Sequence, residues 1–199
     1  MFKASPLGRA GQPSGPALRR ALRAAAAGGA ALLAVLGTQT VTSPSADAAS
    51  AHVKCSARTL PGQPIRISPA VNSRTKAVRA EGTVVLENCT SPDRSQRVIR
   101  SGRLTFSGSA TASCTAARDV RGSATVTWYD VKGGKVGTST VVPRPGSGAA
   151  LNTPLSGSVS KGRMAGSPVR ATVRPTSDVR GCGSKGLSSV HGKGNVSFG

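Results

Sequence analysis

Acidic and aromatic side chains are scarce in this 199-residue sequence. Seven Asp and Glu residues stand against 27 Lys and Arg, two residues are His, and aromatic residues make up 3%. Acid-base catalysis needs titratable groups that converge on one site, and sequence-specific reading of nucleic acid uses a recognition helix or stacked aromatic rings. We therefore expect a protein that is not an enzyme, that needs no metal or cofactor, and that reads no nucleic-acid sequence.

Long apolar runs are also scarce, and the one that stands out lies near the N-terminus. Ala24 to Leu36 form an apolar run that follows Arg19, Arg20 and Arg23, and Ala46 and Ala48 make a small-x-small cleavage site. A second site of this kind follows at 49–51. A membrane anchor needs about 20 apolar residues, more than this run provides. The pattern predicts a signal peptide over residues 1–48. The mature protein is then secreted, extracellular or associated with the cell wall, without a transmembrane segment.

Four cysteines follow the predicted cleavage site: Cys55, Cys89, Cys114 and Cys182. An even number of dispersed cysteines in an exported chain indicates two disulfides, and the C-x-x-C spacing of zinc sites is missing. Three connectivities are possible. We favour Cys55 with Cys89 and Cys114 with Cys182, because sequential pairing closes the N-terminal segment onto an early strand and ties a late loop to the middle of the chain.

From Ala80 onward the sequence breaks into short runs that are rich in Val and Thr and are bounded by Gly, Pro, Asp or Ser. These are strand and turn signals, and most runs alternate apolar with polar residues, so that one face of each strand is apolar. The runs are 82–89, 102–114, 122–130, 135–142, 155–160, 167–174 and 188–198. We expect an all-β fold, an antiparallel β-sandwich or small barrel of roughly eight strands, over residues 80–199.

The sequence also gives expectations for the segment before residue 80, for the hairpin tips and for the aromatic residues. Residues 49–79 contain Pro61, Pro64 and Pro69 and are expected to form an irregular arm with at most two short strands, of which Ile65 to Ser68 is the best candidate. Gly133-Gly134 and the stretch 160–167 are expected at hairpin tips. Three aromatic residues fall on the apolar side of their strands and are assigned to the core: Phe106, Trp128 and Phe198.

The net positive charge of the chain is higher than that of an ordinary protein. Without residues 1–48 the chain has 22 Lys and Arg against six acids, a net charge of +16. A field of this size attracts polyanions in a salt-dependent way. An alternative is that the arginines only reflect composition and keep an exported domain soluble. The candidate residues for binding an anionic surface are Arg94, Arg97, Arg100, Arg103, Arg170 and Arg174.

The runs GTVVLENC, SGRLTFSGSATASC and GSATVTWYD, with Gly, Ser and Thr around a single TW pair, resemble a group of uncharacterised small exported β-sandwich proteins of actinobacteria. The resemblance covers residues 82–198 and implies the same fold. That group has no established biochemical function, so no site residues are carried over. It does imply a Gram-positive envelope, whose external polyanions include wall teichoic acids, anionic lipid headgroups and extracellular DNA.

Three functions are compared. The first is an exported, non-catalytic β-sandwich that associates with anionic cell-envelope polymers through Arg-rich faces. The second is a secreted protease inhibitor with a reactive loop at Arg163-Met164, which the sequence places at a hairpin tip. The third is a hydrolase, which requires Asp130 or Asp178 beside His191. The first function is preferred because no catalytic constellation accompanies the charge.

Overall fold

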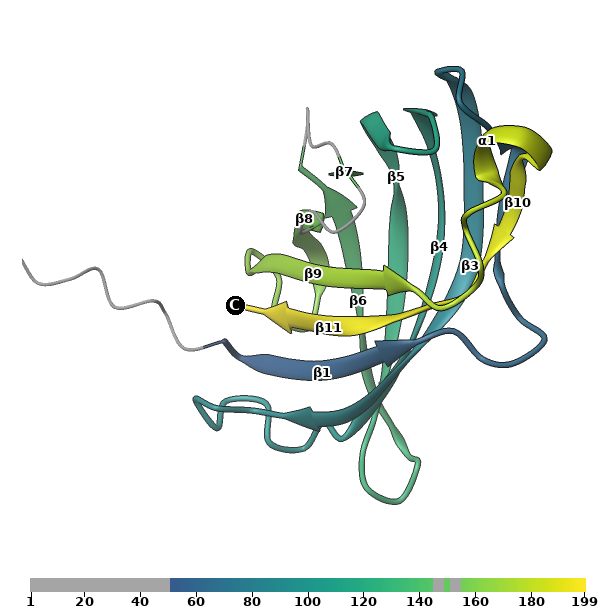
Figure 1. The fold of residues 1–199 in the computed structure, drawn as a ribbon. Coiled ribbons are helices and arrows are strands. Elements are labelled where there is room, and N and C mark those ends of the chain that lie inside the picture. Colours follow the sequence, from purple (N-terminus) through teal and green to yellow (C-terminus); the bar gives the residue numbers. More distant parts are fainter. Residues whose placement is uncertain (1–50, 145–148, 151–154) are drawn as a thin grey trace, which may run out of the picture. The chain divides into compact units, whose positions relative to one another are not determined.

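The computed structural model describes residues 51–144, 149–150 and 155–199, so the predicted signal peptide lies outside the described residues. The described chain is all-β and antiparallel, as predicted (Figure 1). In that part of the chain, no helix has the length and hydropathy needed to cross a membrane. The elements are β1 (Val53–Arg58), β2 (Ile65–Val71), β3 (Lys76–Thr90), β4 (Ser101–Ala112), β5 (Ala116–Tyr129), β6 (Lys135–Pro143), β7 (Ala149–Ala150), β8 (Leu155–Gly162), β9 (Pro168–Pro175), α1 (Cys182–Lys185), β10 (Leu187–Val190) and β11 (Gly192–Phe198).

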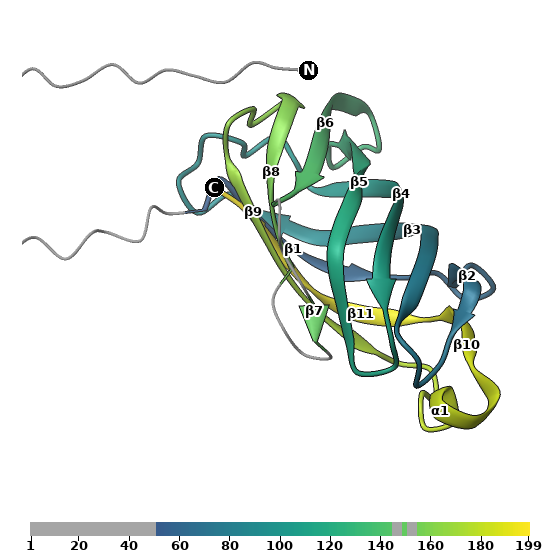
Figure 2. The same cartoon turned by 90° about the horizontal axis from the view of Figure 1, so that it is seen from above.

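Eight of the strands form a closed ring of backbone pairing. Their order is β1-β11-β9-β8-β6-β5-β4-β3, and β3 pairs again with β1. The first and last strands of the fold are neighbours, with Val53 opposite Phe198. β2 and β10 continue the pairing outside the ring from β3, and Figure 2 shows them beside α1 at one end of the strands. Closure leaves β1 with a partner on each side, which protects both of its edges.

The first strand differs from the prediction of an irregular arm over residues 49–79. β1 lies inside that stretch and is a full member of the ring, whereas β2 includes the predicted strand at Ile65 to Ser68. Val53, Cys55 and Ala57 are buried and the residues between them are exposed, which is the alternation of a strand with one face on the core. Its partners lie far along the chain, and its small apolar residues give only a weak local signal.

The strands after residue 80 follow the order of the predicted runs, with three differences. β5 begins at Ala116, before the predicted run 122–130, β7 lies outside the predicted runs, and the last run is divided. The run 188–198 is two strands, because β10 pairs with β2 whereas β11 pairs with β9 and β1. The chain changes partners at His191, whose backbone N–H donates to Ser177 Oγ at 2.6 Å. The side-chain Nδ1 of His191 lies 3.0 Å from Thr59 Oγ1.

The main core fills the ring, and the single Trp is at its centre. Trp128 and Phe198 are fully buried, with their rings edge to face and 5.0 Å between centroids, so both core assignments are confirmed. Phe106 is only half-buried. A Cβ atom on Gly102 would approach the Trp128 ring to 3.0 Å, so this glycine makes room for the indole. Around this pair lie Val53, Cys55, Leu86, Cys89, Ile99, Val126, Val159, Val169 and Val196.

Two disulfides join Cys55 to Cys89 and Cys114 to Cys182, and the favoured connectivity is confirmed. The first lies within the main core and fastens β1 to the end of β3. The second joins the end of β4 to α1 and belongs to a smaller core cluster with Val71, Val78 and Ala112. Each closes a long loop, which restricts the unfolded chain and stabilises the folded one by about 2–4 kcal/mol.

A buried hydroxyl satisfies the indole of Trp128. The Nε1–H group donates to Ser139 Oγ at 2.8 Å, and the Ser139 hydroxyl donates to the Arg163 carbonyl at 2.6 Å. Ser139 is 0% exposed, so water cannot replace it. One hydroxyl therefore connects β5, β6 and the turn after β8.

Replacing Ser139 by Ala is expected to lower the free energy of unfolding by about 1–3 kcal/mol, because a buried N–H and a carbonyl both lose their partner. Urea denaturation followed by Trp128 fluorescence measures it. The control is Ser123→Ala on the exposed side of β5, where little change is expected. Equal effects of the two variants would contradict the role given to the Ser139 hydroxyl.

Candidate functional site

The six candidate arginines do not form one patch. Arg94, Arg97 and Arg100 lie between β3 and β4, Arg103 lies on β4, and Arg170 and Arg174 lie on β9. In the ring, β4 and β9 are separated by three strands in either direction. The exposed side chains of these two strands therefore point away from opposite sides of the ring.

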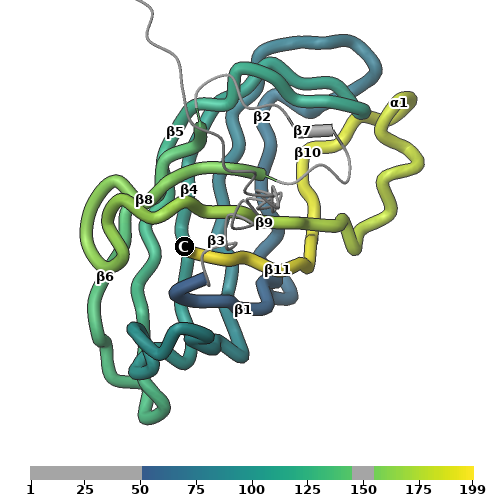
Figure 3. Tube along the Cα trace, turned by 90° about the vertical axis from the view of Figure 1, so that its left-hand side faces the viewer, coloured from purple at the N-terminus to yellow at the C-terminus, as the bar shows by residue number. Residues whose placement is uncertain are grey.

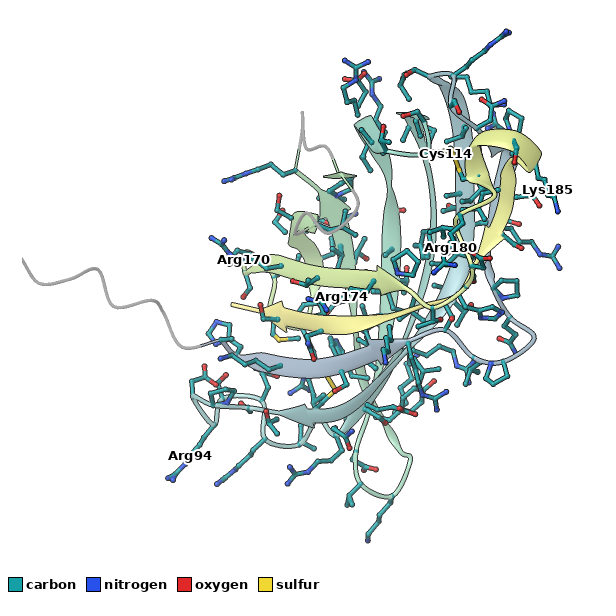
Figure 4. All side chains as sticks on the ribbon, in the orientation of Figure 1. Arg94, Cys114, Arg170, Arg174, Arg180 and Lys185 are labelled. Carbon is teal, nitrogen blue, oxygen red and sulfur yellow. A yellow bond between two sulfur atoms is a disulfide. The ribbon has the colours of Figure 1, made fainter. Side chains whose placement is uncertain are left out.

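Arg170 and Arg174 are joined by cations that the sequence analysis did not select. β11 lies between β9 and β1 (Figure 3). The backbone register places Arg174, Lys193 and Arg58 in one cross-strand row. A second row holds Arg170, Ser197 and Lys54. We call the five exposed cations of these rows the cationic face: Lys54, Arg58, Arg170, Arg174 and Lys193. Figure 4 labels Arg170 and Arg174 on β9.

The geometry of the cationic face follows from strand spacing. Neighbouring strands lie about 4.8 Å apart, so the three cations of the first row sit on adjacent strands at that backbone spacing. The two rows are four residues apart along each strand, or roughly 13 Å. Between them runs a neutral row of hydrogen-bonding side chains, Thr172, Asn195 and Ser56. Like charges placed opposite one another destabilise a sheet, and an anionic partner would relieve this repulsion.

One carboxylate borders the cationic face. Arg58 donates from Nε and a terminal NH2 group to the two Glu87 oxygens at 2.8 and 2.7 Å, a bidentate ion pair. These hydrogen bonds hold the pKa of Glu87 below its ordinary value and raise that of Arg58. Within the described residues, the ion pairs are this one and His52 with Asp93. Among the described residues, the four other cations of the face have no ion-pair partner.

His52 and Asp93 fasten the loop that carries Arg94. His52 Nδ1 contacts the Asp93 carboxylate, which also accepts hydrogen bonds from the hydroxyls of Ser91 and Ser95 and from the Ser95 N–H. The hydrogen bond from His52 is the main reason that the pKa of Asp93 lies well below its usual range. The loop after β3 is thus held at the start of β1, beside the second row of the cationic face.

The same cluster differs from the catalytic arrangement of serine hydrolases. In a catalytic triad the serine and the carboxylate lie at the two different nitrogens of the histidine ring. Here Ser95 Oγ lies 3.4 Å from His52 Nδ1, the nitrogen that already contacts Asp93. The cluster therefore serves to anchor the loop.

The residues named for a hydrolase occupy separate hydrogen-bonding sites. Asp130 accepts from the backbone N–H groups of Lys132 and Gly134 in the β5–β6 turn. Asp178 accepts from the Arg180 N–H. His191 contacts Thr59 as described above. In the part of the chain that the structure describes, no three His, Cys, Asp or Glu side chains are grouped so as to hold a metal ion.

The Arg163-Met164 segment is a tight turn. Met164 has a φ of 58°, its side chain packs against the main core, and the Ser167 N–H donates to the Met164 carbonyl. The Arg163 guanidinium donates to Gln96 Oε1 and to the Val136 carbonyl. An inhibitory loop must be extended and must present its arginine to the protease, so this geometry does not favour the inhibitor function.

Comparison with protein-family models, with curated proteins and with solved structures finds no match to this chain. Lys54, Arg58 and Lys193 were missed in the sequence because nothing local brings them together with Arg170 and Arg174. The sequence does show alternating exposed charges in residues 53–58. Only the pairing of β1 with β11 shows that these charges lie beside other cations.

The loop anchor gives a pH-dependent prediction. Because the pKa of Asp93 is depressed in the folded protein, its contribution to stability is present above the ordinary carboxyl pKa, about 3.9, and is lost as the pH falls below that value. Asp93→Asn is expected to destabilise the protein at pH 7, and the difference from the parent should shrink at acid pH. Urea midpoints measured from neutral to acid pH test this.

The matched control for that measurement is Asp119→Asn, which removes the same charge at an exposed position with a φ of 54° that Asn also adopts. It is expected to show a small difference from the parent. A destabilisation by Asp93→Asn that stays constant as the pH falls would refute the anchoring role of the carboxylate.

Proposed function

We propose that the protein is exported and binds anionic cell-envelope polymers without catalysis, through the cationic face. The observation that carries the proposal is the placement of five cations in two cross-strand rows over β9, β11 and β1, with Glu87 as the bordering acid. The two disulfides support an oxidising compartment, as expected for a chain that leaves the cytoplasm.

The chemistry of the face suits a phosphate-bearing polymer. Guanidinium groups donate paired hydrogen bonds to phosphate oxygens, and Arg170 and Arg174 lie at the edge of the face. The neutral row between the cations offers hydroxyl and amide groups to the hydroxyls of such a polymer. Because the described outward residues of these three strands include no aromatic ring, stacking on nucleic-acid bases is not available there. Teichoic-acid-type polymers are thus our preferred partners.

The proposal predicts sedimentation of the protein with purified Gram-positive cell walls that contain teichoic acid. Binding should be strong at low salt and weak near physiological salt, because phosphate contacts release counterions. The variant Arg170→Gln/Arg174→Gln/Lys193→Gln should weaken binding by about tenfold or more. Walls stripped of teichoic acid should retain little protein.

The matched control removes the same charge elsewhere, in Arg74→Gln/Lys132→Gln/Lys185→Gln, three exposed positions outside the cationic face. This variant should lose only the small part of the wall binding that depends on the total charge of the protein. If both triple variants lose binding equally, binding depends on the total charge of the protein and not on the position of the cations. If the parent protein is not retained by walls at any salt concentration, the proposal is rejected.

A further inference from the structure

A second polar region lies on the outward side of β2, β3, β4 and β5. Two adjoining hollows of about 620 and 690 Å³ share Arg66, Glu81 and Ser107 as lining residues. We call this region the polar groove. The loop between β1 and β2 contributes one rim of it through Gln63. None of the functions considered above uses this surface.

Three arginines line the polar groove. The register places Arg66 opposite Glu81, and it places Arg79 and Arg121 on either side of Ser109 in the next row. Among the described residues, no hydrogen bond or ion pair of these three guanidinium groups is found, although Glu81 lies directly across from Arg66. Their donors are therefore available to a ligand, and the net charge favours an anion.

Two glycines shape the floor of the groove. Gly108 and Gly122 face one another across β4 and β5, and a Cβ atom on Gly122 would lie 2.3 Å from the Ser107 carbonyl oxygen. The φ of Gly122 is 138°, outside the range that side chains prefer. Paired glycines inside strands mark a bend or a close approach of backbones. The close approach of β4 and β5 therefore requires glycine at these two positions, and both glycines line the second hollow.

The other half of the groove offers hydroxyl groups. Thr83, Thr105 and Thr125 form one cross-strand row, and Ser107 and Ser123 form the next. Hydroxyls both donate and accept hydrogen bonds, and the Glu81 carboxylate accepts from hydroxyl donors. A ligand that uses every group here has to combine an oxyanion with several hydroxyls.

We infer that the polar groove binds a short segment of a polyhydroxylated chain that carries oxyanions. The arginines hold the oxyanion, and Glu81 and the threonine row bind the hydroxyls. A polyol phosphate and an acidic saccharide share this chemistry. The inference does not depend on the cationic face, which lies on other strands, and it stands if that face binds nothing.

The test is an NMR titration of the whole mature protein, labelled with ¹⁵N, with three probes: an oligomer of glycerol phosphate, an oligogalacturonate of equal charge, and inorganic phosphate. Either oligomer should shift the amides of Thr105, Ser107 and Ser123 and should bind more tightly than inorganic phosphate. The stronger of the two identifies the oxyanion. Equal affinity for inorganic phosphate would overturn the inference, because the hydroxyls would then contribute nothing.

Two variants separate the contributions. Arg66→Gln/Arg121→Gln should weaken oligomer binding at the groove by roughly tenfold, whereas the equally charged control Lys132→Gln/Lys185→Gln, at exposed positions outside both the groove and the cationic face, should change it much less. Thr105→Val keeps the shape of the residue but removes its hydroxyl, so it should weaken the oligomer several-fold and leave inorganic phosphate unchanged. Trp128 fluorescence checks that each variant is folded.

Equal losses in these two double variants would overturn the inference. So would an unchanged oligomer affinity in Thr105→Val. Retention on cell walls through the cationic face is measured separately, so a failure of either proposal is recognisable by itself.

Discussion

The position of β1 between β11 and β3 is the constraint on which the rest of the structure depends. Six residues close a ring of eight strands, and three of them, Val53, Cys55 and Ala57, face the main core. Covalent and polar links act at the same place, since Cys55 is bonded to Cys89 and His52 holds Asp93. Without this strand, β3 and β11 would each have an open edge, and Trp128 and Phe198 would lose one wall of their enclosure.

The same constraint creates the cationic face. Lys54 and Arg58 alternate with the buried residues of β1, so the pairing that buries Val53 and Cys55 also places Arg58 opposite Lys193 and Lys54 opposite Ser197 on β11. Backbone pairing and core burial hold Arg174, Lys193 and Arg58 together at strand spacing, where the repulsion between like charges destabilises the fold. An extended polyanion would neutralise both rows. The rows are already assembled in the folded protein, so binding would not have to bring the cations together.

The sequence predicted most of the strands because the alternation of apolar and polar residues is a local signal. Alternation with Gly and Pro punctuation located the strands from β3 to β11 except β7, and four cysteines left only three possible pairings. It did not predict the role of β1, whose partners lie 27 to 36 residues away on β3 or at the other end of the chain on β11. The set of binding residues predicted from the sequence was incomplete for the same reason. Arg94, Arg97, Arg100 and Arg103 are periodic in sequence but are divided between the loop after β3 and the strand β4. Arg58 and Lys193, by contrast, meet only through tertiary pairing.

Amide hydrogen exchange of the folded protein tests most directly whether β1 closes the ring. The account predicts that the backbone N–H groups of Lys54, Ser56 and Arg58 are protected as strongly as those of β4 and β5, because β1 is bonded on both sides. Reduction of the Cys55–Cys89 disulfide should weaken this protection first in β1. Fast exchange throughout 53–58 in the oxidised protein would contradict the account, because the ring would then be open and the cationic face unassembled.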